Sequence, residues 1–123
     1  MTRYFSQEHE WIEIEGDLGT VGITDYAQGQ LGDITFVDLP AEGATFEKGD
    51  SVAVVDSVKA ASDVYTPVSG TIAEANDVLA DQPELVNTDA EVGGWLFRIT
   101  LSDASELEAL MDEAAYKDYV ASL

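Results

Sequence analysis

The sequence predicts one mainly β domain, a sandwich or small barrel, with a short internal helix and a helix at its C-terminal end. The chain has 123 residues, which suits a single domain around one core. Apolar residues make up 46% of it and aromatic residues 9%, enough to bury a core and to exclude wholesale disorder. Short β-type segments separated by turn residues fill roughly the first hundred positions, and helical spacing appears only after them. We expect a core over about residues 10–101 and a helical extension over about 102–123, both within one domain spanning 1–123.

Seven segments combine β-branched or aromatic residues with turn residues at their ends. Turn signals include Glu15-Gly16-Asp17, Lys48-Gly49-Asp50 and Pro67-Val68-Ser69-Gly70. The strands predicted between such signals cover residues 10–14, 18–23, 34–39, 51–57, 63–68, 70–75 and 94–101.

Two stretches are predicted to be helical. Thr24 is placed to cap a short helix that ends at Gly32. From Ser102 onward the apolar residues are spaced three or four apart, and a serine followed three positions later by Glu makes a capping box at Ser102 or Ser105. We expect one terminal helix whose apolar face packs on the β core through Leu107, Leu110, Met111 and Ala114.

The charge of the chain restricts its partners. Against 25 acidic residues there are 5 basic ones, so the net charge is −20. Such a chain lacks the Lys and Arg that neutralise phosphates, which argues against nucleic acid and anionic membranes as partners. The excess acidity fits either adaptation to high salt or attraction of a basic partner, and the sequence does not separate the two.

The cysteine and histidine content limits the chemistry. With no Cys and one His, the chain offers no disulfide, no thiolate nucleophile and no zinc cluster, so no metal site is predicted. Met1 is followed by polar and charged residues rather than an apolar signal region, and no apolar run approaches the length of a membrane span. We expect a cytoplasmic protein of a prokaryote.

A locally symmetric segment surrounds Lys59. Reflection about the Lys59–Ala60 bond pairs Ser57 with Ser62, Asp56 with Asp63 and Val55 with Val64. Two antiparallel strands in this register would form a hairpin with Lys59 at its tip, closed by a type I turn. The same pattern is compatible with an ordinary exposed lysine, and with a helical start at residues 58–61.

Several motifs carry a specific resemblance along nearly the whole chain. Val58-Lys59-Ala60 after a strand, followed by Asp63 and by Thr66-Pro67-Val68-Ser69-Gly70, resembles the attachment hairpin of biotinyl/lipoyl carrier domains. The motifs that narrow the resemblance to the H-protein family of the glycine cleavage system are His9-Glu10-Trp11, Val21-Gly22-Ile23-Thr24-Asp25-Tyr26-Ala27, Leu31-Gly32-Asp33, Phe36-Val37-Asp38-Leu39-Pro40, Glu84-Leu85-Val86-Asn87 and Gly93-Gly94-Trp95.

The resemblance implies a non-catalytic carrier with a barrel-sandwich hybrid fold. Lipoate would be attached covalently to Lys59, in a recognition hairpin that comprises Ser57, Val58, Ala60, Ala61 and Asp63. The implied partners are a lipoylating enzyme and three enzymes of the glycine cleavage system. These are the PLP-dependent glycine decarboxylase (P-protein), the tetrahydrofolate-dependent aminomethyltransferase (T-protein) and dihydrolipoyl dehydrogenase (L-protein). The arm would carry the aminomethyl group of glycine from the first enzyme to the second, and the third would reoxidise it.

The resemblance also implies a cleft that shelters the loaded arm. Glu10 and Asp63 occupy the positions expected to hold its ammonium group by charge-assisted hydrogen bonds. His9 is expected to be a structural residue or part of the cleft lining. Two positions depart from the family pattern: Tyr26 stands where many members have His, so only a hydroxyl is available there, and Glu8 stands where some members have a small hydroxyl residue.

Other functions remain compatible with part of the pattern. A lipoyl depot, which donates its arm to other complexes, would use the same residues. A biotin domain would usually have Met on both sides of the lysine, and a lipoyl domain of a 2-oxo acid dehydrogenase would usually have Asp where Val58 stands. Two more distant alternatives are a carboxylate-pair hydrolase on a small β scaffold and an acidic interaction module without chemistry.

Overall fold

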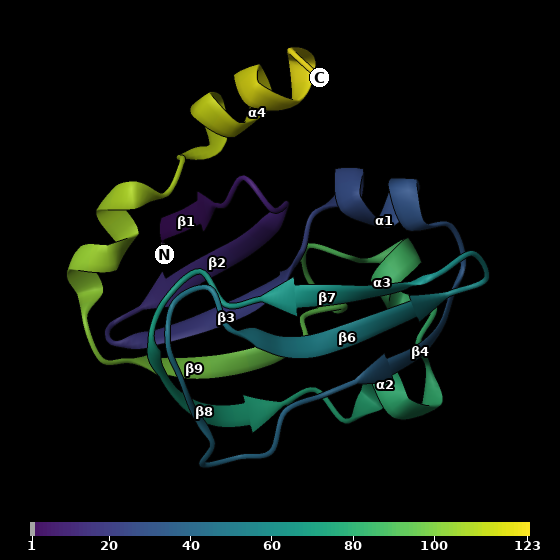
Figure 1. Cartoon of the computed structure of the whole chain (residues 1–123), viewed down its shortest axis with the longest axis horizontal. Helices are drawn as coiled ribbons and strands as arrows, with labels where there is room; N and C mark the ends of the chain where they lie inside the picture. Colours follow the sequence, from purple (N-terminus) through teal and green to yellow (C-terminus); the bar gives the residue numbers. More distant parts are fainter. Residues whose placement is uncertain (1) are drawn as a thin grey trace.

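Two β-sheets lie on either side of one hydrophobic core in the computed structural model, which describes residues 2–123 (Figure 1). All paired strands are antiparallel. The larger sheet consists, in spatial order, of β1 (Thr2–Phe5), β2 (Glu10–Glu15), β3 (Leu18–Ile23), β9 (Phe97–Leu101), β8 (Gly70–Ala75) and β5 (Thr45–Phe46). The smaller sheet consists of β4 (Ile34–Asp38), β6 (Ser51–Ser57) and β7 (Ala61–Tyr65). The predicted barrel-sandwich architecture is confirmed.

The core forms where the inward-facing residues of the two sheets meet. Val21, Ile72 and Ile99 come from the larger sheet and are at most 2% exposed. Val55 and Val64 come from the smaller sheet and are equally buried. Alternation along each strand places these apolar side chains on one face, and their removal from water is the main stabilising contribution.

The internal helix is α1 (Asp25–Leu31), and its predicted ends are confirmed. The Thr24 hydroxyl accepts a hydrogen bond from the backbone N–H of Ala27, and Gly32 terminates the helix with a φ of +81°. Two one-turn helices, α2 (Val78–Asp81) and α3 (Leu85–Thr88), were not predicted, because four residues are too few to show helical spacing.

Several strand boundaries differ from the prediction. The short strands β1 and β5 were not predicted. The strand predicted over residues 63–68 is displaced and ends at Tyr65, because Pro67 lacks a backbone N–H and the Thr66 hydroxyl donates to the carbonyl of Val68 in a turn. The strand predicted over residues 94–101 begins only at Phe97, after a turn in which the Gly94 N–H bonds to the carbonyl of Asp89.

The predicted C-terminal helix is confirmed, but the prediction that it runs continuously from Ser102 was wrong. The segment forms a 3₁₀ helix (Ala104–Ala109) and then α4 (Glu113–Ala121), which are separated by one extended stretch. Met111 exchanges two backbone hydrogen bonds with Phe5, of 2.7 and 2.8 Å, and this pairing is incompatible with a continuing helix.

The caps and the apolar face of this segment also differ from the prediction. Asp103 and Asp112, rather than Ser102 or Ser105, cap the two helices. Leu107 and Leu110 pack on the core as expected, whereas Ala114 is exposed.

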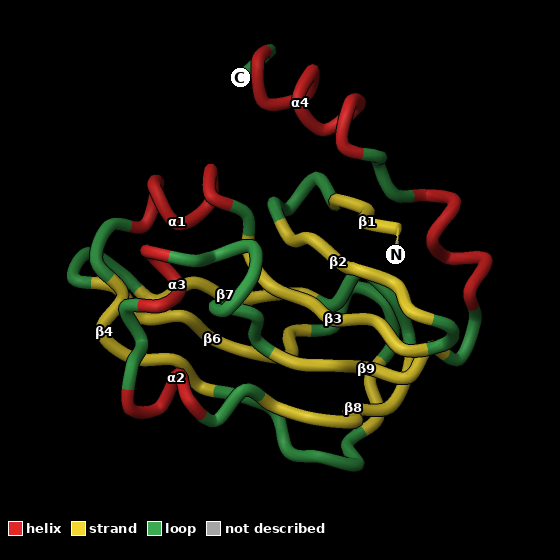
Figure 2. The backbone as a smooth tube through the Cα atoms, turned by 180° about the vertical axis from the view of Figure 1, so that it is seen from behind, coloured by secondary structure: helices red, strands yellow, loops and turns green. Residues whose placement is uncertain are grey.

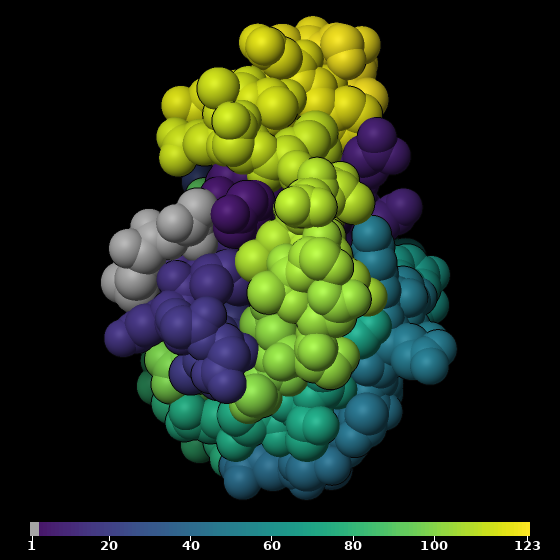
Figure 3. Space-filling model, turned by 90° about the vertical axis from the view of Figure 1, so that its left-hand side faces the viewer, coloured from purple at the N-terminus to yellow at the C-terminus, as the bar shows by residue number. Residues whose placement is uncertain are grey.

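Residues 102–123 run along one side of the molecule and end beyond β1. Figure 2 shows α4 on the β1 side of the larger sheet, and Figure 3 shows the segment as a continuous ridge over that side. Tyr116 anchors α4 by stacking on Phe5, with ring centroids 4.7 Å apart. Among the helices of residues 2–123, none is both long and apolar enough to cross a membrane.

Candidate functional site

Lys59 lies at the tip of the β6–β7 hairpin. The observed register pairs Val54 with Asp63, Val55 with Ser62 and Asp56 with Ala61. The predicted mirror register, with Ser57 opposite Ser62, was therefore wrong by two residues. A shift of two preserves which face each side chain occupies, so the inward and outward sets are unchanged.

Ser57 stabilises this register, in which the turn is centred on Val58 and Lys59 instead of Lys59 and Ala60. Its backbone N–H donates to the carbonyl of Ala60 at 2.8 Å, so the loop between these two residues contains only Val58 and Lys59. Its hydroxyl accepts from the N–H groups of Lys59 and Ala60, both at 3.2 Å, and donates to the Ala60 carbonyl at 3.1 Å. Neither Val58 nor Lys59 has a positive φ, so this turn does not need the Gly of the favoured two-residue hairpins, and the Ser57 oxygen satisfies its amides.

The tip is tied to the loop that follows α1. The Val58 N–H donates to the carbonyl of Asp33 at 3.1 Å. The side chain of Lys59 passes beside Gly32, since a Cβ placed on Gly32 would lie 3.5 Å from Lys59 Cε. Val58, Lys59 and Ala60 are exposed, and Lys59 forms no ion pair within residues 2–123.

A cleft of about 260 Å³ lies between the start of β2, helix α1 and the β6–β7 hairpin, and we call it the arm cleft. Its apolar lining is Ile23, Ala27, Leu31, Val55 and Val64. Leu31 directly precedes Gly32, so the wall of the arm cleft begins one residue from the point that the Lys59 side chain touches.

The polar lining of the arm cleft contains the residues that the resemblance assigned to such a cleft, together with Glu8. Glu8, His9, Glu10, Tyr26 and Asp63 all line it. Glu8 and Asp63 are exposed at its rim, and Asp63 accepts a hydrogen bond from the Ser51 hydroxyl at 3.1 Å. The hairpin residues Ser57, Val58, Ala60 and Ala61 do not line it, although Ser62 does.

Glu10 is a buried carboxyl group in this cleft. Only 3% of the residue is exposed, and burial raises the pKa of Glu10 from 4.5 to about 7. Two hydrogen bonds oppose this shift, from the Ser6 hydroxyl at 2.6 Å and from the Tyr65 N–H at 3.3 Å. The carboxyl is thus placed where a cation would stabilise its ionised form.

His9 is held by an unusual backbone and by aromatic rings. It has a φ of +66°, a left-handed conformation that His tolerates better than β-branched residues do, at the turn between β1 and β2. Its ring lies 4.7 Å from that of Tyr26 and 5.8 Å from that of Tyr119, and its Nδ1 is 2.9 Å from the Tyr116 hydroxyl. Burial lowers the pKa of His9, and the nearby Glu8 carboxylate partly opposes this.

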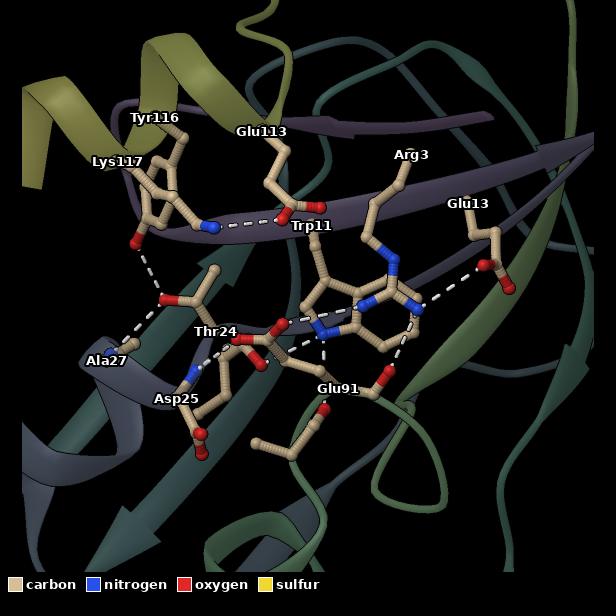
Figure 4. Close-up of polar contacts among 12 residues, drawn as sticks. Arg3, Trp11, Glu13, Thr24, Asp25, Ala27, Glu91, Glu113, Tyr116 and Lys117 are labelled. Atoms are coloured by element: carbon tan, nitrogen blue, oxygen red, sulfur yellow. Dashed lines mark hydrogen bonds and ion pairs between the residues drawn. The ribbon is translucent and has the colours of Figure 1, made fainter. Parts of the chain in front are cut away.

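A larger groove of about 590 Å³ is lined by none of the predicted site residues. Two of its cations stack on tryptophans, Arg3 on Trp11 and Arg98 on Trp95, each 4.3 Å from the ring. Arg3 also pairs with Glu13 and Glu91 (Figure 4), and Arg98 pairs with Glu74. Both arginines are already paired with carboxylates of this chain, so we interpret the groove as part of the structure rather than as a functional site.

Comparison with known proteins identifies the family of this chain. A family model described as glycine cleavage H-protein matches residues 3–123. The chain belongs to the glycine cleavage H-protein family. Its function is that of the lipoyl carrier of the glycine cleavage system, and its fold is the lipoyl-carrier barrel-sandwich.

Individual relatives agree over nearly the full length. The glycine cleavage system H protein of Bartonella quintana (strain Toulouse) is 58% identical over 117 residues, which cover 95% of this chain and 96% of that protein. The protein of the same name from Bradyrhizobium diazoefficiens is 57% identical over 120 residues and 98% of each chain. The crystal structure of a glycine cleavage system H protein from Mycobacterium marinum superposes with a TM-score of 0.89 at 35% identity, covering 98% of this chain and 97% of that one.

Sequence reasoning missed some residues that shape the site. Ser6 bonds to Glu10, and Gln30 and Leu31 line the arm cleft. Ser6 stands four residues before Glu10 at the end of an unpredicted strand, so nothing in the local pattern pointed to it. Tyr116, more than one hundred positions from His9, reaches it only through the docking of α4. Within residues 2–123 no group of three or more His, Cys, Asp or Glu side chains is arranged to hold a metal ion.

Proposed function

We propose that Lys59 carries the lipoyl group and that the arm cleft shelters the loaded arm between enzymes. The observation that carries this proposal is the position of the Lys59 side chain, which is exposed at a tip and also adjoins the wall of the cleft. Lysine extended by lipoate spans roughly 15 Å, from about a dozen bonds near 1.5 Å. Such an arm is long enough to reach outward to an enzyme and to fold back into the cleft.

The residues that line the cleft fit a lipoyl group. Lipoate has an apolar chain, and the cleft is lined by apolar side chains together with the carboxyl group of Glu10. When bound, the lipoyl group supplies a sulfur that holds the aminomethyl group of glycine. The residues of the chain do the rest: Glu10 and Asp63 accept hydrogen bonds from the ammonium, and the apolar wall excludes water from the labile carbon–sulfur bond.

Tyr26 and His9 both line the cleft, and their rings lie 4.7 Å apart. With Tyr26 in place of an imidazole, this position offers a hydroxyl group for hydrogen bonding. The chain itself is proposed to catalyse no step, so purified chain alone should not turn over glycine.

The hairpin tip is proposed as the surface read by the lipoylating enzyme and by the P-, T- and L-protein types of partner. Asp33 is exposed beside the tip, Asp63 is exposed farther along β7, and Val58 is 66% exposed at the tip. With a net charge of −20, the chain favours partners that present basic surfaces around an opening for the arm. We propose that these encounters take place in the cytoplasm, in keeping with the bacterial relatives.

Mass spectrometry tests the attachment. After expression with lipoate and the lipoylating enzyme, a peptide that contains Lys59 should carry one lipoyl group, and Lys59→Arg should carry none. Lys48→Arg is a matched control, because Lys48 is a second exposed lysine in a turn and should leave the modification intact. A lipoyl group on another lysine, or biotin on Lys59, contradicts the proposal.

A second experiment tests the cleft. The lifetime of the aminomethyl-loaded arm in water should shorten in the double variant Glu10→Gln, Asp63→Asn, which removes both carboxylates with little change in shape. An unchanged lifetime would show that these carboxylates do not hold the ammonium.

A further inference from the structure

The C-terminal helix reaches the arm cleft through one hydroxyl group. Tyr116 of α4 is 7% exposed, and its Oη lies 2.9 Å from His9 Nδ1 and 2.7 Å from Thr24 Oγ1. Figure 4 shows the second of these bonds continuing from Thr24 to the N–H of Ala27. His9 lines the cleft whereas Tyr116 does not, so Tyr116 acts on the cleft through His9.

The direction of the hydrogen bonds follows from the burial of Thr24. Thr24 is fully buried, and its Oγ1 already accepts from the Ala27 N–H at 3.3 Å. Its own proton needs an acceptor, since a buried unpaired donor is destabilising. Within the part of the chain that the structure describes, Tyr116 Oη is the one acceptor in hydrogen-bond reach of this hydroxyl. Thr24 therefore donates to Tyr116.

The proton of Tyr116 is then directed at the imidazole. Tyr116 Oη receives the Thr24 proton, so its own proton points to His9 Nδ1, which must be the unprotonated nitrogen of the ring. A neutral imidazole with an acceptor at Nδ1 carries its proton on Nε2. Protonation of Nδ1 would place two hydrogens between Nδ1 and Oη unless Tyr116 and Thr24 both reversed their bonds.

We propose that Tyr116 is a positioning residue of the arm cleft, which holds His9 as the neutral Nε2–H tautomer and so keeps positive charge out of the cleft. The inference rests on the proposed function, because the cation to be admitted is the ammonium of the loaded arm. An imidazolium in the same cleft would repel that ammonium and compete for the Glu10 carboxylate.

The groups around His9 are consistent with this role. Glu8 favours protonation of the ring, but burial outweighs it and the pKa of His9 is lowered. Glu10 adjoins His9 in the cleft, and the rings of Tyr26 and Tyr119 flank the imidazole. Burial raises the pKa of Tyr116, which preserves its hydroxyl as a donor.

Nitrogen NMR of the unmodified chain tests the hydrogen-bond direction without any arm attached. His9 is the only histidine, so the long-range proton–nitrogen spectrum contains a single imidazole. We expect a pyridine-type Nδ1 and a pyrrole-type Nε2 at neutral pH. A pyrrole-type Nδ1 in the unaltered chain would overturn the proposal, whatever the fate of any variant.

Two substitutions on α4 distinguish the effect of the Tyr116 hydroxyl on the His9 tautomer from the effect of ring packing. Tyr116→Phe keeps the ring that stacks on Phe5 and removes the hydroxyl, so the spectrum should change to a mixture of tautomers. Tyr119→Phe removes a hydroxyl from the same helix, beside the same imidazole, and should leave the spectrum unchanged. Among residues 2–123 that hydroxyl donates to the carbonyl of Gln7, at 3.5 Å, and not to His9. If Tyr116→Phe also leaves the spectrum unchanged, Tyr116 does not set the tautomer.

The loaded arm supplies the functional readout. Near pH 6.5, the ordinary pKa of imidazole, its lifetime should shorten about two- to fivefold in Tyr116→Phe and stay constant in Tyr119→Phe. A changed spectrum with an unchanged lifetime would refute the role in the cleft. If no lipoyl group is found on Lys59, the proposed function fails, while the tautomer result still stands on its own.

Discussion

The carboxyl group of Glu10 is placed to hold a cation, and we predict that it lowers the stability of the folded chain when it ionises. Glu10→Gln replaces a group that ionises with one of almost the same shape that does not. Burial raises the pKa of Glu10 from 4.5 to about 7, so between these pH values the folded chain holds a proton that the unfolded chain has released. The stabilising contribution of this proton is fully present below pH 4.5 and is lost as the pH rises through about 7.

The size of the effect follows from the shift. About 2.5 pKa units correspond to about 3 kcal/mol of unfolding free energy. The amide of Gln and the protonated carboxyl both carry a hydrogen where the carboxylate carries none, so the two proteins should have similar stability near pH 4.5. At about pH 8 the variant should be more stable than the unaltered chain by up to about 3 kcal/mol.

Urea unfolding followed by tryptophan fluorescence, repeated at fixed ionic strength across this pH range, measures the difference. The other 24 acidic residues occur in both proteins and largely cancel. A difference that stays constant within about 0.5 kcal/mol from pH 4.5 to 8 would refute the reasoning, since it would mean that Glu10 titrates normally. In the loaded chain the ammonium requires the ionised form, so retention of the arm should weaken about tenfold for each pH unit below about 7.

Three further predictions concern the hairpin, its support and the charge. Gly32→Ala should destabilise the chain by about 1–3 kcal/mol, because Gly32 has a φ of +81°. Gly29→Ala, inside α1 with open space around it, should stabilise the chain by up to about 1 kcal/mol. Thermal unfolding compares the two variants, and equal effects would contradict the backbone argument. Ser57→Ala should lower the kcat/KM of lipoylation about two- to tenfold by loosening the tip, and Ser57→Thr, which keeps the hydroxyl, should restore most of it. Raising the salt concentration should increase the Kd for a client enzyme, as measured by calorimetry, and a Kd insensitive to salt would separate recognition from the net charge of −20.

The parts of the fold that were predictable are those specified by local chemistry. Thr24 and Gly32 bracket α1 because one side chain accepts an amide hydrogen bond and the other residue tolerates a positive φ, both of which are readable from residue type. The terminal helix was mispredicted because Met111 pairs with Phe5, and no local pattern reveals a partner more than one hundred positions away. Spacing alone also could not reveal that α4 begins at its own cap, Asp112.

In the candidate site, too, some residues were predictable from the sequence and others depend on distant contacts. Motif resemblance singled out Lys59, Glu10 and Asp63, and the last two line one cleft beside the first. The predicted hairpin register was wrong because it relied on the symmetry between like residues, whereas the hydrogen bonds of Ser57 centre the turn one residue earlier, on Val58 and Lys59. Tyr116 could not be foreseen, since its effect depends on a tertiary contact.

The bond between Val58 and Asp33 has a consequence for how the carrier meets its partners. Because this bond fixes the hairpin tip to the body of the molecule, motion of the tip should add little to the volume explored by the arm proposed at Lys59. The length of the arm would then set that volume, and the effective concentration of its reactive end would stay high both in the cleft and at a docked active site. Breaking this bond should lower that effective concentration.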